Sequence, residues 1–240
     1  MEKVKEVVFD EYAEKYDAWF LKNKNVLYSE LKLVAHCLQD AGRIYSVGCG
    51  SGLFEQILSE DFGIQIQEGL EPSADMARIA VKRGLKVDVC TAENATYNRQ
   101  LYDTILYNGC PGYIADLELA LSKSYCALKP GGKIILIDIP KESGYGLLYN
   151  LAKSVGRWNH RLLKDVYPQS PYPMELVSQA NWRTTQEKVE LMYNVGLSDF
   201  SFYQTLIRHP FYSNEGIEEP MEGYDRGDYV AICGYKRQKR

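Results

Sequence analysis

Hydrophobic residues along this chain follow two spacings that alternate from the N-terminus onward. Spacings of three and four predict two helices within residues 1–40, on Phe9, Tyr12, Tyr16, Trp19 and Phe20 and then on Leu27, Leu31, Val34 and Leu38. Short apolar runs predict strands at residues 44–47, 64–70, 85–90, 102–107 and 133–139. Helical spacing returns between them, near residues 53–58, 73–80 and 116–128. This alternation predicts an α/β fold with a mostly parallel sheet and helices on both of its faces.

The alternation breaks after residue 140. Residues 141–182 form a long insertion, in which one apolar stripe predicts a helix through Leu147, Leu148, Leu151, Val155, Trp158 and Leu162. Pro168, Pro171 and Pro173 then argue against regular structure. An insertion of this length is typical of a lid or cap, and packing over an exposed sheet edge is the alternative.

Regular spacing resumes after the insertion. Thr184 and Glu187 have the spacing of a capping box and predict a helix that ends near Gly196, followed by strands at 200–206 and 228–235. We therefore predict one domain over residues 1–240. Its parts are an N-terminal helical cap (1–40), a ligand-binding core (41–140), a cap insertion (141–182) and the rest of the core (183–240).

Charge and cysteine usage narrow the function classes. The formal net charge is −4 and the isoelectric point is about 5.5, which argues against a nucleic acid as the main partner. The six cysteines form no CxxC pair, so we expect free thiols. No signal peptide is recognisable, and the apolar runs are too short to span a bilayer. These features predict a cytoplasmic protein that does not associate with membranes.

The segment Val47-Gly48-Cys49-Gly50-Ser51-Gly52 lies between a predicted strand and a predicted helix. Glycines there allow a sharp turn and let the backbone approach a ligand without a Cβ clash. The spacing differs from the dinucleotide pattern G-x-G-x-x-G, because Leu53 occupies the position of the last glycine. The tighter loop suits a ligand that has an adenosine and a carboxylate end but no pyrophosphate.

Three further features lie at the ends of the following strands. Glu71 ends the second strand, 19 residues after Gly52, where a carboxylate can accept both hydroxyl groups of a ribose. Ala92-Glu93 follows the third strand and can reach an adenine edge, and Asn108-Gly109 ends the fourth. All of them should lie at the carboxyl ends of the strands, where open α/β sheets bind their ligands.

The sequence resembles the class I S-adenosylmethionine-dependent methyltransferases, in particular the small-molecule branch related to ubiquinone and menaquinone methyltransferases. The matching stretches are Phe9-x-x-x-Ala13-x-x-Tyr16-Asp17-x-Trp19-Phe20, the glycine loop, Gly69-Leu70-Glu71-Pro72-Ser73-x-x-Met76, Ala92-Glu93-Asn94, Leu128-Lys129-Pro130-Gly131-Gly132 and Asn194-Val195-Gly196-Leu197. The resemblance implies a Rossmann-like sheet of seven strands whose last strand is antiparallel. It also implies S-adenosylmethionine as cofactor and a small-molecule methyl acceptor.

The resemblance also implies roles for individual residues. Gly48, Cys49, Gly50 and Gly52 would form the loop around the methionine and ribose, Glu71 would bind the ribose, and Pro72, Ser73, Met76, Ala92 and Glu93 would lie around the adenine. Asn108 would lie near the transferred methyl group, and Tyr16 and Trp19 would close the pocket. Two positions depart from the family pattern: Ser46 and Thr91 stand where the family usually has acidic residues. Both changes remove charge-assisted contacts to the cofactor.

No catalytic residue is evident from the sequence. His160, in the aromatic insertion, and Tyr16 are candidates, whereas His36 is better explained by helix packing and His209 follows a late strand. No metal-binding pattern is visible. Three alternatives stay open beside a small-molecule methyltransferase: a protein or RNA methyltransferase, a non-catalytic S-adenosylmethionine-binding regulator, and a nicotinamide-dependent dehydrogenase. The methyl acceptor and the choice between monomer and homodimer also stay open.

Overall fold

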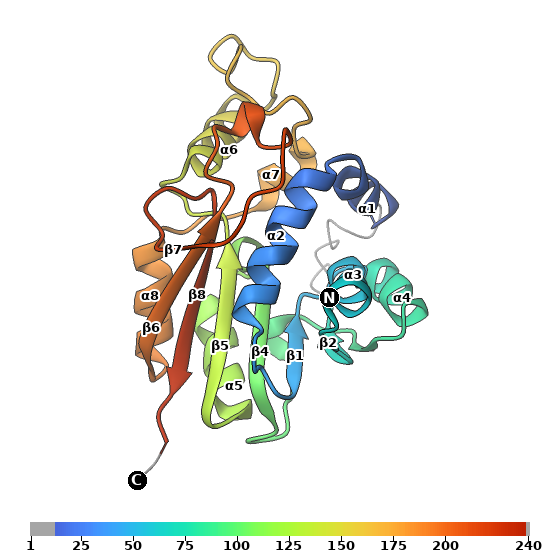
Figure 1. Ribbon diagram of the computed structural model, residues 1–240, viewed down its shortest axis with the longest axis vertical. Coiled ribbons are helices and arrows are strands. Elements are labelled where there is room, and N and C mark those ends of the chain that lie inside the picture. Colours follow the sequence, from blue (N-terminus) through green and yellow to red (C-terminus); the bar gives the residue numbers. More distant parts are fainter. Residues whose placement is uncertain (1–12, 239–240) are drawn as a thin grey trace, which may run out of the picture.

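The computed structural model describes residues 13–238 and contains one mixed β-sheet (Figure 1). The strand order is β3-β2-β1-β4-β5-β8-β6-β7. β1 to β5 are mutually parallel, and β8 is antiparallel to both β5 and β6. The strands are β1 (Ile44–Val47), β2 (Glu68–Leu70), β3 (Lys86–Asp88), β4 (Tyr102–Asn108), β5 (Leu128–Asp138), β6 (Leu197–Thr205), β7 (Met221–Glu222) and β8 (Tyr229–Lys236).

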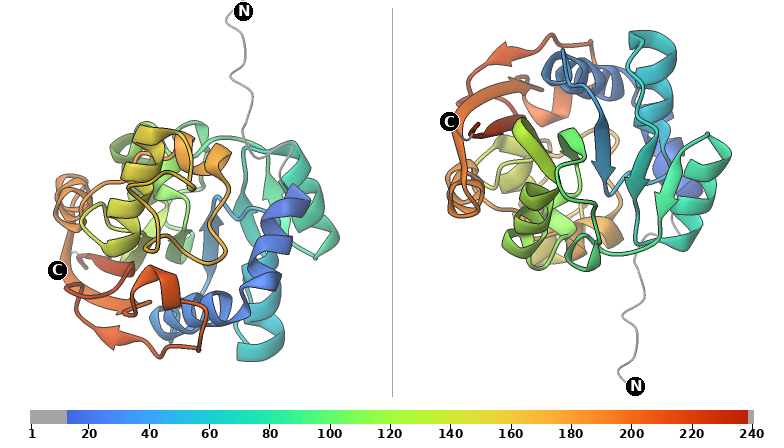
Figure 2. Two further views of the ribbon diagram at one scale, coloured as in Figure 1. Left: turned by 90° about the horizontal axis from the view of Figure 1, so that it is seen from above. Right: turned by 90° about the horizontal axis from the view of Figure 1, so that it is seen from below.

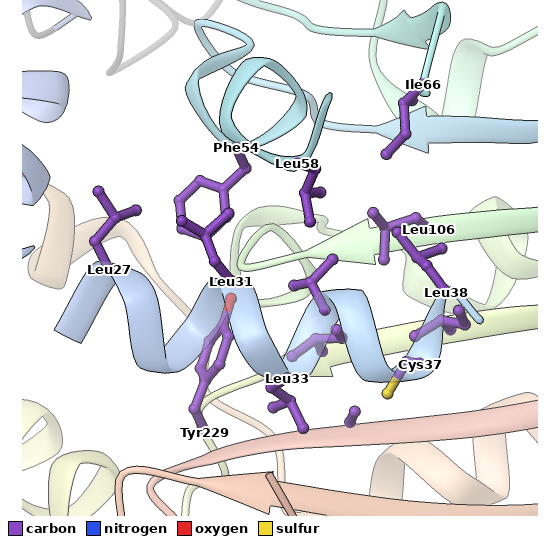
Figure 3. Close-up of a cluster of buried hydrophobic side chains, with 14 of the residues drawn as sticks. Leu27, Leu31, Leu33, Cys37, Leu38, Phe54, Leu58, Ile66, Leu106 and Tyr229 are labelled. Carbon is purple, nitrogen blue, oxygen red and sulfur yellow. The ribbon is translucent and has the colours of Figure 1, made fainter. Parts of the chain in front are cut away.

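Helices cover both faces of this sheet, as the alternating pattern predicts. The α-helices are α1 (Ala13–Lys22), α2 (Lys24–Cys37), α3 (Leu53–Phe62), α4 (Ala74–Lys82), α5 (Leu117–Ala127), α6 (Gly144–Val155), α7 (Met174–Gln179) and α8 (Thr185–Asn194). α2 and α3 pack on one face, where their leucines and phenylalanines form a cluster with side chains from β4, β5 and β8 (Figure 3). α5 and α8 cover the opposite face.

The central strands are buried on both sides. In β5, Ile135 and Ile137 face the α2 side, whereas Ile134 and Leu136 face the α5 side. Successive side chains of a strand point to opposite faces, so a continuous apolar run is what a doubly covered strand requires. This explains why residues 133–139 stand out in the sequence.

The insertion forms a cap above the carboxyl ends of the strands (Figures 1 and 2). It has a core of its own, built from the large aromatic residues of the segment together with Leu163, Val177 and Ala180. The prediction of one long helix here was wrong. Gly156, with φ of +74°, ends α6, so Trp158 and Leu162 lie beyond the helix, where Trp158 is buried and Leu162 is exposed. Residues 168–173 form no helix or strand, as the three prolines predict, and α7 begins directly after Pro173.

Other details also differ from the sequence predictions. The sheet has eight strands within residues 13–238, because the two-residue strand β7 pairs with β6 at the edge. The strands predicted at 64–70 and 85–90 are shortened to β2 and β3. Phe9 and Tyr12 lie outside the described residues. Within the described part of the chain, no helix has the length and apolar character needed to cross a membrane.

Candidate active site

The glycine loop joins β1 to α3 at the carboxyl edge of the sheet. Gly48, Gly50 and Gly52 all have positive φ, at +66°, +57° and +73°. At Gly48 an added Cβ would lie 2.7 Å from the Cβ of Cys110, so the loop has no room for a larger residue there. A Cβ on Gly50 would meet no atom within 4 Å, so this residue borders open space. The loop therefore leaves bare backbone at this edge of the sheet, where the sequence predicts a ligand.

Glu71 lies beside the loop, at the end of β2. Its side chain is 5% exposed, and its carboxylate accepts the backbone N–H of Gly50 at 2.9 Å and that of Ser73 at 2.8 Å. The Ser73 hydroxyl in turn caps α4 by accepting the N–H of Met76. These bonds fix the carboxylate between the glycine loop and the first turn of α4.

Ser46, which stands where the resembled family has an acid, contacts a carboxylate from another element. Its hydroxyl donates to Oε1 of Glu55 at 2.7 Å, and Glu55 lies in the first turn of α3. Glu55 is 4% exposed, and burial raises the pKa of its carboxyl, partly offset by the Ser46 hydrogen bond. Its Oε2 atom is buried and has no hydrogen-bond partner within residues 13–238. Glu55 was not among the predicted site residues, because its position in α3 gives no signal of its contact with β1.

A buried network ties the N-terminal helix to the loop. The Ser51 hydroxyl donates to Asp17 of α1. Arg83, at the end of α4, donates to the Ser51 carbonyl at 2.8 Å and to Asp17 at 2.7 Å. α1 is thereby held over the glycine loop, which places Tyr16 near the site. Tyr16 lies near enough to Glu30, Asp17 and Glu55 for their charges to add to burial in raising the pKa of its hydroxyl.

Asn108 lies at the end of β4, with Oδ1 accepting the hydroxyl of Tyr229 at 2.9 Å. Tyr229 starts β8 and was not among the predicted site residues, because β8 follows β4 by more than a hundred residues and only the sheet brings them together. Figure 3 shows the Tyr229 ring beside the Leu27–Leu31 turn of α2. Tyr229 therefore connects the rim at Asn108 to the interior next to α2.

Comparison with known proteins identifies the family. Residues 19–187 match the family model described as a methyltransferase domain. This chain is a methyltransferase. It is 32% identical, with a TM-score of 0.81, to a Thermotoga maritima structure described as an S-adenosylmethionine-dependent methyltransferase and possible histamine N-methyltransferase; the match covers 96% of this chain and 99% of that one.

Sequence relatives agree with this assignment. The methyltransferase is 29% identical to an uncharacterised protein of Methanocaldococcus jannaschii, over 95% of this chain and 98% of that protein. It is 25% identical to the mitochondrial ubiquinone biosynthesis O-methyltransferase of Mus musculus, over 63% of this chain and 44% of that enzyme. The class I fold and S-adenosylmethionine as cofactor are thus confirmed.

The structure of the methyltransferase also places the remaining candidate residues. Cys49 in the loop and Met76 in α4 are both buried. Ala92 is buried after β3, and Pro72 is half-buried beside Glu71. The Glu93 carboxylate accepts the N–H groups of Ala115 and Asp116 and so anchors the start of α5. Glu93 therefore has a structural contact besides its predicted place near the adenine.

The histidines make mainly local contacts. Nδ1 of His160 accepts the N–H of Leu162, and Nδ1 of His209 accepts that of Phe211. The ring of His36 packs against Tyr203, with 4.5 Å between their centroids. None of these contacts, within the described chain, involves a residue of the glycine loop or Glu71. A catalytic role for His160 stays a prediction without a supporting contact.

Proposed function

We propose that this enzyme transfers a methyl group from S-adenosylmethionine to a small-molecule acceptor that binds between the carboxyl edge of the sheet and the cap. The observation that carries this proposal is the Glu71 carboxylate, fixed by Gly50 and Ser73 beside an open glycine loop. Some relatives, matched over 24–62% of their own length, are named as methyltransferases of ubiquinone biosynthesis or of phosphoethanolamine. These names support a small-molecule acceptor.

The residues at the rim fit the cofactor. Glu71 would accept the ribose hydroxyls, and the backbone at Gly50 would let the ligand approach closely. The buried, unpartnered Oε2 of Glu55 requires a donor, and the methionine ammonium group supplies one with the opposite charge. We therefore assign to Glu55 the contact that an acid at position 46 makes in the resembled family. S-adenosylmethionine, when bound, supplies an electrophilic methyl group on a positive sulfur.

The cap and α1 exclude water from this region. The indole N–H of Trp19 donates to the carbonyls of Ser170 and Pro171, both at 3.2 Å, and its ring packs edge-on against Tyr172. α1 is therefore bonded to the cap on one side and to the glycine loop on the other. Closure of this kind holds the acceptor in line with the methyl group, and orientation supplies much of the rate of such a displacement.

Titration calorimetry with S-adenosylmethionine and, separately, with NAD tests the proposed site. We expect binding of S-adenosylmethionine in the micromolar range and no heat with NAD. The absence of S-adenosylmethionine binding to the folded protein would contradict the proposal. Binding of both ligands would show that the loop does not select against a pyrophosphate.

The Glu55→Gln variant tests the methionine contact. Loss of the charge-assisted bond should weaken S-adenosylmethionine about 10- to 100-fold, since a hydrogen bond to a charged group contributes about 1.5–3 kcal/mol. 5′-Methylthioadenosine, which lacks the amino acid part, should bind the variant and the wild type equally, as measured by the same calorimetry. Equal weakening of both ligands would show that Glu55 only supports the loop.

A further inference from the structure

Glu30 is a buried carboxyl group that the cofactor site does not use. It lies on α2 between Leu27 and Leu31, and it is 7% exposed. Within the described chain, no hydrogen bond or ion pair to its carboxylate is present. Burial raises the pKa of Glu30 to about 8. A buried carboxyl without a partner is costly to the folded protein, so its presence calls for an explanation.

Four tyrosines from three other elements lie near enough to this carboxyl for its charge to influence their pKa values. They are Tyr16 of α1, Tyr145 and Tyr149 of α6, and Tyr229 of β8, and each has its pKa raised first by burial and further by nearby charges that include Glu30. The Tyr145 hydroxyl is bonded to Ser213 at 2.7 Å, and the Tyr229 hydroxyl to Asn108. The hydroxyls of Tyr145 and Tyr229 are therefore bonded to groups other than Glu30.

This group of residues lies between the cofactor edge and a surface pocket. Tyr229 reaches Asn108 at the end of β4, and Tyr16 responds to both Glu30 and Glu55. On the opposite side, Tyr145 and Val26, which is one helical turn before Glu30, line a pocket of about 260 Å³ between α1 and the cap. The pocket therefore reaches α2 one helical turn before Glu30.

We propose that Glu30 binds a protonated amine of the methyl acceptor within this tyrosine-walled interior and removes its proton, so that the enzyme is an N-methyltransferase. This inference rests on the proposed function. A cation is the ligand that an unpartnered carboxylate requires, and tyrosine rings favour a cation through their faces. Glu30 and the tyrosines therefore act on the same charged group.

The buried position of Glu30 favours transfer of a proton from the bound ammonium group to its carboxylate. The bound ammonium gives a proton to the Glu30 carboxylate, which leaves a neutral amine beside a neutral carboxylic acid. Burial disfavours both charges and so favours this neutral pair. The nitrogen lone pair then forms the N–C bond to the methyl group while the C–S bond breaks. Its electron pair stays on sulfur as a neutral thioether, and the product is an N-methylammonium ion.

Among the described residues, no cation contributes to the pKa of Glu30. Burial is the cause of the Glu30 shift, and the titratable groups around it are the four tyrosines, with Asp228 close to Tyr145 and Tyr149. A positive acceptor is therefore the group that allows Glu30 to ionise in the closed site. Above its pKa of about 8 the free enzyme has the carboxylate ready to bind the ammonium.

Transfer of a radioactive methyl group tests the inference. The acceptors are 2-phenylethylamine and hexylamine, with 2-phenylethanol and hexanol as matched neutral controls. We expect label in the amines and not in the alcohols. Glu30→Gln should lower kcat/KM for the amines about 10²- to 10⁴-fold, the range of general base catalysis, and should leave the affinity for S-adenosylmethionine unchanged. Glu60→Gln, at an exposed carboxylate of α3, should match the wild type.

A pH profile supplies a readout that does not depend on a variant. In the wild type, kcat/KM for 2-phenylethylamine should rise through an apparent pKa of about 8, and Glu30→Gln should lack this rise. Three results, each with intact S-adenosylmethionine binding, would overturn the inference and leave the proposed function standing. They are label only in the alcohols, no label in either amine, and unchanged amine activity in Glu30→Gln. Loss of S-adenosylmethionine binding by the wild type would instead overturn the proposed function.

Discussion

Glu71→Ala should lower the affinity for S-adenosylmethionine about 100-fold, which is about 3 kcal/mol. The carboxylate is held by the N–H groups of Gly50 and Ser73, so it is oriented before the ligand arrives. Its removal takes away the acceptor of the ribose hydroxyls, and hydrogen bonds to a charged group contribute about 1.5–3 kcal/mol each. Titration calorimetry measures the change directly.

Two controls separate ribose recognition from general damage. Glu68→Ala changes a carboxylate on the same strand, but this one is at the amino end and is bonded to Arg43 and Tyr102, so the affinity should not change. 5′-Methylthioadenosine retains the ribose and should be weakened by Glu71→Ala as much as S-adenosylmethionine is. A Glu71→Ala protein that unfolds cooperatively but binds with wild-type affinity would refute the role of this residue.

Local hydrogen bonds explain which parts of the fold were predictable. Ser73 caps α4 through the N–H of Met76, and Thr184 and Glu187 form the capping box of α8. In both cases the bonded residues are three positions apart, so both can be recognised in one short stretch of sequence. Glu71 was predictable for a similar reason, because a carboxylate at the end of a strand is placed by that strand. The cofactor edge therefore follows from short-range patterns.

Strands pair with segments that are distant in the sequence, which explains why the predicted length of the second strand was wrong. The apolar residues Ile64 and Ile66 suggested a long second strand, but β1 has four residues and its pairing with β2 extends only over Glu68–Leu70. Ile64 instead donates its N–H to Leu58 at the end of α3, and Ile66 is buried in the core beside α2. The extent of a strand depends on its partner, which the local sequence does not reveal.

The two proposed site residues that the sequence did not indicate, Glu55 and Glu30, share one property. Each of them interacts with residues of another element that is distant in the sequence. Glu55 bonds to Ser46 only because the fold brings α3 to the end of β1, and the charge of Glu30 influences tyrosines that belong to α1, α6 and β8. Acidic residues on amphipathic helices are usually exposed, so their burial has no sequence signal. The sequence hint that bears on the proposed role of Glu55 is Ser46, which stands where the resembled family usually has an acid.

Lys188→Met should destabilise the protein by about 3–5 kcal/mol at pH 7. Lys188 of α8 is 1% exposed, and its Nζ lies 3.9 Å from Oδ2 of Asp138, which is 2% exposed at the end of β5. Oδ1 of Asp138 accepts the N–H of Ile139. Burial raises the pKa of Asp138, whereas the charge of Lys188 lowers it. Loss of the lysine leaves a buried carboxylate without a counter-charge.

The pH dependence of this loss has a definite sign. Without Lys188, the pKa of Asp138 in the folded protein lies further above its unfolded value of about 3.9, so the folded state holds the proton more tightly. The free energy of unfolding therefore falls as the pH rises from about 4 toward the folded pKa. The loss measured by urea unfolding should be smaller at pH 5 than at pH 7.

A double variant shows whether the missing charge is the cause. Lys188→Met combined with Asp138→Asn removes both charges and keeps the acceptor for the Ile139 N–H, so much of the lost stability should return and its pH dependence should disappear. Arg78→Ala breaks the exposed pair with Asp75 and should change stability by less than about 1 kcal/mol. If the double variant is as unstable as Lys188→Met, the lysine acts through its packing in α8 and not through Asp138.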